Sequence, residues 1–127
     1  MRWTIAMLSV ASLAAAPAIA AQWGKVTANK KGAVVYVDYA AIVRDGSKVT
    51  APVKWDYTAV ESEKNPIEVD NMVFDCAAKT FSMIDFTYYD TDGKVARKGK
   101  GPVLGMVAVP DPSIAKEIFD ALCRNDT

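Results

Sequence analysis

The residues of this chain that could do chemistry are carboxylate pairs, a basic run and two cysteines. The 127 residues include no histidine, which excludes Ser-His-Asp and Cys-His sites and most zinc sites. Two carboxylate pairs remain as acid and base candidates, Glu61 with Glu63 and Asp90 with Asp92. Both pairs fall in an expected loop or turn, where solvated carboxylates are ordinary. We therefore expect no catalytic residue and no enzyme.

Residues 90–93, Asp-Thr-Asp-Gly, resemble part of a calcium loop. The third oxygen ligand, the position of the glycine and the terminal glutamate do not fit such a loop. A hairpin turn is the expected structure, and the sequence predicts no metal and no cofactor.

Four basic residues lie close together in the sequence, at Lys94, Arg97, Lys98 and Lys100. On a strand, Lys94, Lys98 and Lys100 would share one face and Arg97 would lie opposite. Such a face could attract an acidic partner, for example a sulfated glycan or an acidic protein patch. The same lysines could instead protect an exposed sheet edge from pairing with other chains. These four residues are the candidate binding surface.

Three aromatic residues at strand spacing form a second candidate. Trp55, Tyr57 and Tyr36 could line a groove for a peptide or a small apolar ligand. The alternative is that they pack within the core and on the sheet face.

The first 20 residues have the pattern of a secretory signal peptide. Arg2 precedes an apolar run at residues 5–16, and small residues follow up to Ala20 and Ala21, where cleavage is expected. The run is shorter than the roughly 20 residues that span a bilayer. No cysteine lies directly after this run, at the place where a lipid would be attached, so a lipid anchor is not expected. The mature chain, residues 21–127, is expected to form one domain.

Loss of Arg2 leaves 14 basic and 15 acidic residues, a net charge of −1 (15 − 1 = 14; 14 − 15 = −1). This balance is unlike that of a nucleic-acid-binding protein. Both cysteines, Cys76 and Cys123, lie in the mature part, and paired cysteines are normal in exported chains. A bond between them would close a loop of 47 positions (123 − 76). An intermolecular bond or a metal pair is the alternative, although two thiolates without histidine make a poor metal site.

The expected fold that positions these residues is α+β. Residues 49–57 alternate apolar and polar side chains with period two, which indicates a strand with one buried face. Pro52 cannot donate to a ladder, so its stretch should lie at an edge or a bulge. Asp111 as N-cap and Pro112 at the first helical position predict a C-terminal helix. About six antiparallel strands are expected, at residues 23–28, 33–37, 49–57, 67–76, 80–89 and 94–100.

The order of these features resembles the surface-adhesin protein E-like family, small exported bacterial proteins with an antiparallel sheet and a C-terminal helix. The residues that carry the resemblance are Trp23, Tyr36, Asp38, Tyr39, residues 53–57, Asp75, Cys76, Tyr88, Tyr89, Asp90, Asp92, Gly93, Pro110, Ser113, Leu122 and Cys123. The chain departs from the pattern in two ways. It has no cysteine for lipidation, and it has Leu104, Gly105 and Met106 where relatives commonly carry a tryptophan.

The resemblance implies a binding role, because the namesake of the family is an adhesin for host matrix and serum proteins and plasminogen. The expected function is a non-enzymatic binding module in the bacterial periplasm or at the cell surface, with another protein as partner. Exposed sheet edges would also allow two copies to pair. The alternatives are a periplasmic carrier of a small apolar ligand and a periplasmic enzyme that uses carboxylates.

The signal-peptide hypothesis predicts the N-terminus of the exported protein. Intact-mass spectrometry of protein recovered from outside the cytoplasm should give a chain that begins at Ala21 or Gln22. A chain that begins at Met1 would contradict secretion.

Overall fold

The structure is a computed structural model that describes residues 20–60, 63–101 and 105–124. The predicted signal peptide lies outside these residues, apart from Ala20. Within the described part of the chain, no helix has the length and hydrophobicity needed to cross a membrane.

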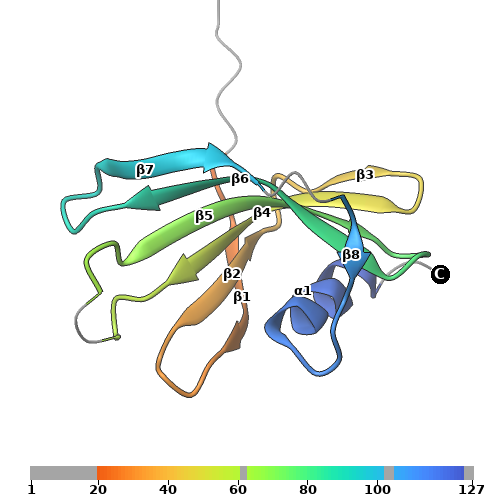
Figure 1. The fold of residues 1–127 in the computed structure, drawn as a ribbon, viewed down its shortest axis with the longest axis horizontal. Coiled ribbons are helices and arrows are strands. Elements are labelled where there is room, and N and C mark those ends of the chain that lie inside the picture. The colour runs from red at the N-terminus through yellow and green to blue at the C-terminus, as the bar shows by residue number, and fades with distance from the viewer. Residues whose placement is uncertain (1–19, 61–62, 102–104, 125–127) are drawn as a thin grey trace, which may run out of the picture.

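The described residues form one antiparallel sheet with a helix packed on one of its faces, as Figure 1 shows. The strand order is β1-β2-β4-β5-β6-β7, with β3 paired to β4 and β8 paired to β6. The α+β class, the antiparallel sheet and the C-terminal helix expected from the sequence are confirmed. Strands β3 and β8 were not expected, and they are only three and two residues long. The elements are β1 (Trp23–Ala28), β2 (Val34–Asp38), β3 (Val43–Asp45), β4 (Lys48–Asp56), β5 (Ile67–Asp75), β6 (Thr80–Tyr89), β7 (Val95–Lys100), β8 (Val107–Ala108) and α1 (Ile114–Cys123).

The core lies between α1 and the face of the sheet that we call the inner face. Directly paired residues of neighbouring strands share a face, so the register identifies the rest of the inner and the outer face. Phe74 stacks on Phe81 with ring centroids 5.8 Å apart and lies 6.4 Å from the Phe119 ring of the helix. Burial of each large apolar side chain contributes roughly 1.5–3 kcal/mol. The core residues are Val35, Val37, Val49, Ala51, Val53, Met72, Phe74, Ile118, Phe119 and Leu122.

Strand β4 is interior to the sheet, with β5 on one side and both β2 and β3 on the other. The β2 pairing ends at Val53 and the β3 pairing begins at Thr50. Pro52 lies in the gap between them, where β4 has no partner strand on that side. The expectation of an edge therefore holds locally at Pro52, although the strand itself is central.

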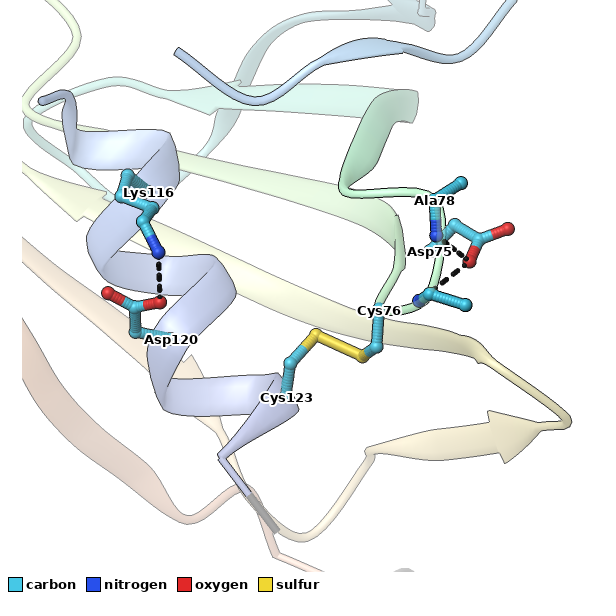
Figure 2. The surroundings of a disulfide bond; sticks show 7 residues. Asp75, Cys76, Ala78, Lys116, Asp120 and Cys123 are labelled. Carbon is cyan, nitrogen blue, oxygen red and sulfur yellow. Dashed lines mark hydrogen bonds and ion pairs between the residues drawn. A yellow bond between two sulfur atoms is a disulfide. The ribbon is translucent and has the colours of Figure 1, made fainter. Parts of the chain in front are cut away.

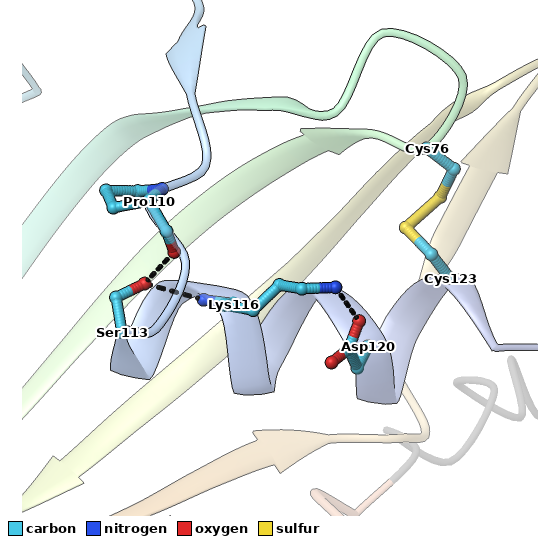
Figure 3. A network of polar contacts seen from close by, with 6 residues as sticks. All are labelled: Cys76, Pro110, Ser113, Lys116, Asp120 and Cys123. Atoms are coloured by element: carbon cyan, nitrogen blue, oxygen red, sulfur yellow. Dashed lines mark hydrogen bonds and ion pairs between the residues drawn. A yellow bond between two sulfur atoms is a disulfide. The ribbon is translucent and has the colours of Figure 1, made fainter.

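The helix begins later than the sequence suggested. The N-cap is Ser113, whose extended backbone (φ −166°, ψ 167°) excludes the two preceding residues from the helix. Its Oγ accepts a hydrogen bond from the Lys116 N–H at 3.0 Å and donates to the Pro110 carbonyl at 2.6 Å (Figure 3). The prediction of Asp111 as N-cap and Pro112 as first helical residue is therefore wrong, because the Ser113 hydroxyl satisfies the free N–H group.

A disulfide between Cys76 and Cys123 joins the end of the helix to the turn after β5 (Figure 2). The Cα atoms are 5.6 Å apart and 47 positions separate the cysteines. The turn itself is ordered by Asp75, whose Oδ1 accepts the N–H groups of Ala77 and Ala78 at 3.1 and 3.0 Å. The Ala78 hydrogen bond is the main reason that the pKa of this exposed carboxyl lies below its usual value.

The disulfide should contribute much of the stability of the domain. A closed loop of 47 positions corresponds to roughly 4 kcal/mol in the chain-entropy model. Cys76→Ser should lower the melting temperature by roughly 16–32 °C in circular dichroism, since 1 kcal/mol shifts a domain of this size by about 4–8 °C. The double variant Cys76→Ser/Cys123→Ser should melt like the single one, and an unchanged melt would contradict a structural role for the bond.

Candidate functional site

The four basic residues singled out in the sequence lie on or next to edge strand β7, and we call them the basic strand. Lys98 pairs with Thr87 and Lys100 with Asp85 on the outer face, whereas Arg97 pairs with Tyr88 on the inner face. Lys94 precedes β7, and its backbone N–H donates to Asp90 Oδ1 at 2.9 Å.

All four basic side chains are exposed, and none makes an ion pair with another described residue. Lys116 and Asp120, 2.7 Å apart on the helix, form the sole salt bridge among the described residues. Asp85 lies opposite Lys100, but its Oδ1 accepts a hydrogen bond from the Asn71 amide at 2.7 Å. The basic strand is therefore an exposed, cationic stretch of the edge that is free to bind an acidic group.

The inner side of β7 packs on Phe86 of β6. The Arg97 guanidinium lies 5.5 Å from the centre of the Phe86 ring. A side chain at Gly99 would bring its Cβ within 2.8 Å of Phe86 Cζ, so the ring lies directly against the backbone of β7. Phe86 thus links β7 to the inner face of the sheet.

The three candidate aromatic residues do not form one groove. Trp55 pairs with Val35 of the core and faces inward, whereas Tyr36 pairs with Lys54 and faces outward. The Lys54 ammonium lies 4.8 Å from the Tyr36 ring and 4.7 Å from the Trp23 ring, which gives two cation–π contacts. The sheet therefore separates Tyr36 from Trp55.

One member of each carboxylate pair proposed from the sequence, Glu63 and Asp90, lies on the lining of one shallow hollow at the loop end of the sheet. Glu61 lies outside the described residues, and Glu63 is exposed. Asp90 uses its Oδ1 to accept the backbone N–H groups of Asp92 and Lys94, both at 2.9 Å, in the turn between β6 and β7. This geometry gives Asp90 a role in forming the turn.

A different pair of carboxylates is buried in the structure, at Glu68 and Asp70 on the inner face of β5. Their side chains are 8% and 2% exposed. Sequence reasoning missed this acid pair, because apolar residues Ile67 and Val69 occupy the alternate positions and suggest the opposite face as the buried one. Glu68, Asp70, Met72 and Phe74 follow one another at intervals of two residues, and Met72 and Phe74 are core residues. This spacing could have placed the two acids on the buried face.

Burial shifts the proton affinities of the acid pair and of the nearby phenols. Desolvation, with a further contribution from Glu68, raises the pKa of Asp70 to about 7. Desolvation also raises the pKa of Glu68. The pKa of Tyr88 rises to about 12, mainly through the polar contact of its hydroxyl with Glu68, and that of Tyr57 rises to about 12, mainly through burial.

The acid pair lacks the ligands of a metal site. Among the described residues, no three acidic or cysteine side chains gather as a metal ion would require. A shallow, largely apolar hollow of about 580 Å³ lies elsewhere, at the end of the sheet where the β4–β5 and β6–β7 connections meet. Its lining includes Tyr57, Ile67 and Tyr89 but neither member of the acid pair.

Comparison with known proteins gives one match. The family model described as surface-adhesin protein E matches residues 23–124, which run from the start of β1 to just past α1. No curated protein and no solved structure matches the chain significantly.

Proposed function

The chain belongs to the surface-adhesin protein E family, and from that membership we propose that it is a non-enzymatic binding module, acting outside the cytoplasm, that holds an acidic segment of another protein against the basic strand. The family match covers the sheet and the helix together. An adhesin-like role therefore applies to the domain as a whole. The predicted signal peptide and the disulfide support a location outside the cytoplasm.

The observation that carries the proposal is the edge position of a basic strand that makes no ion pair within the described part of the chain. Strand β7 has β6 as its neighbour on one side and no strand beyond it among the described residues. Its free N–H and C=O groups could pair with an extended segment, as in strand addition. Lys98 and Lys100, two residues apart on the outer face, would lie opposite acidic side chains that alternate along such a segment.

Pairing between two copies would be another use of the same edge. An acidic segment is favoured, because two identical basic strands side by side would repel each other. Light scattering of the free protein would distinguish self-association from binding to a different partner.

One observation favours the alternative of a carrier for a small apolar ligand. The hollow of about 580 Å³ has a mainly apolar lining and falls in the volume range of ligand sites. The space between the sheet and α1, by contrast, is filled by core side chains. A carrier would therefore use the hollow at the loop end of the sheet.

The proposal predicts which lysines matter for binding. The triple variant Lys94→Gln, Lys98→Gln, Lys100→Gln should keep the fold, because all three side chains are exposed. It should weaken binding of a fluorescent peptide of alternating Glu and Thr about 10- to 100-fold in fluorescence anisotropy, at about 0.5–1 kcal/mol per exposed charge pair. Added salt should weaken binding by the wild-type protein.

The matched control removes the same charge elsewhere. Lys25, Lys30 and Lys31 are exposed on β1 and in the turn after it, and their replacement by Gln should leave peptide binding unchanged. Equal losses in the two triple variants would show non-specific attraction and contradict the proposed site. Binding of heparin in place of the peptide would assign the strand to a sulfated glycan.

A further inference from the structure

The helix covers only one end of the inner face of β5. Met72 and Phe74 lie in the core under α1, whereas Asp70 and Glu68 continue along the same face towards the other end of the strand. Both carboxyl groups are nevertheless removed from water, at 2% and 8% exposure. Something other than the helix must cover them.

Aromatic side chains of the neighbouring strands provide this cover. In the register, Trp55 and Tyr88 flank Glu68 on its two sides, and Phe86 flanks Asp70. Each of these aromatic residues is half-buried, whereas the acids are almost inaccessible. Water therefore reaches the aromatic residues more readily than the two acids. We call Trp55, Phe86 and Tyr88 the aromatic cover.

The hydrogen bonding of the buried carboxyl is incomplete. Asp70 Oδ1 and Trp55 Nε1 are both buried, and neither has a hydrogen-bond partner among the described residues. The Trp55 indole lies near Asp70 and partly offsets the rise in the pKa of that carboxyl. Its N–H group nevertheless does not reach hydrogen-bond geometry with Asp70. A buried, unpaired carboxylate oxygen is costly when charged and much less so when protonated.

Among the described residues, no basic side chain contributes to the pKa shifts of the acid pair. The titratable groups that act on it are themselves acidic: Tyr57 just after β4, Glu63 of the following loop, and Asp85 and Tyr88 of β6. Arg97 of β7 lies on this face with its guanidinium over the Phe86 ring, and Arg44 lies at the other end of the face, paired with Val49. Two ionised carboxylates would therefore repel each other in a poorly solvated place.

We infer that the acid pair and its aromatic cover form a proton-sensitive latch, which holds the β5–β6–β7 part of the sheet closed while a proton is bound and loosens it when both carboxylates are ionised. Phe86 connects the latch to the edge, because it is the β6 register partner of Asp70 on one side and its ring packs on Gly99 of β7 on the other. Hydration of the carboxylates would displace this ring. Strand β7 would then lose its inner packing.

The direction of the pH effect follows from the raised pKa of Asp70. The folded protein holds this proton up to a pH of about 7, whereas the unfolded chain releases it near pH 4. The stabilising effect is therefore complete below about pH 4 and is lost as the pH rises through 7. This inference does not depend on the proposed binding function, since it concerns stability and local opening alone.

Chemical denaturation of the disulfide-bonded protein between pH 4.5 and 8.5 tests the latch. For wild type, the unfolding equilibrium constant should rise on the order of 10²-fold between pH 5 and 8 relative to Asp70→Asn. Asp70→Asn is isosteric and cannot ionise, so its stability should vary much less. Glu68→Gln should reduce the effect by removing the neighbouring charge.

The matched control is Asp92→Asn, an exposed carboxyl in the β6–β7 turn, which should keep the wild-type profile. Carbon-13 NMR of the Asp70 carboxyl provides a readout that needs no variant. A midpoint below pH 5, or the same pH profile for wild type and Asp70→Asn, would overturn the inference.

Hydrogen exchange tests the local part of the inference. After correction for the intrinsic effect of pH on exchange, amides of β6 and β7 in wild type should lose protection above pH 7 while those of β2 and α1 keep theirs. Asp70→Asn should keep protection in both regions. A uniform loss across the sheet would show a global effect and overturn the latch.

Discussion

The constraint on which the rest of this fold depends is that a ten-residue helix must cover one face of a much wider sheet. The Cys76–Cys123 bond fixes where this helix lies, because it ties the last helical residue to the turn after β5. Ile118 and Leu122 of the helix then pack with Phe74 of the sheet in one apolar core. The remainder of the inner face must be covered by side chains of the sheet itself.

The two ends of the inner face consequently have different physical character. Under the helix, apolar side chains pack on each other, and their burial does not depend on pH. Beyond the helix, aromatic rings lie over carboxyl groups, and burial there is favourable to the extent that the acids are neutral. One continuous strand, β5, passes from the first environment at Phe74 to the second at Glu68.

Features set by neighbouring residues could be predicted from the sequence, and those set by distant packing could not. The alternation from Val49 to Trp55 identified β4 and its buried face, because period two is a local property. The acid pair was missed because Ile67 and Val69 look like the buried face when β5 is considered alone. The N-cap was misplaced because Asp111 and Ser113 are both good caps, and the backbone path into the helix decides between them.

The position of the basic strand depends both on the limited cover by the helix and on the aromatic packing of the inner face. The helix and disulfide leave the β7 edge uncovered, so the exposed lysines can meet a partner without any rearrangement of the core. Because the helix does not extend over β7, Phe86 is the inner support of that strand, and Phe86 is also the β6 register partner of Asp70. Lys98 and Lys100 point to the outer face, where water screens their charge from the buried acids. In the inferred latch, the two sets of charges are coupled mainly through Phe86, because this residue packs on β7 and pairs with Asp70 in the register.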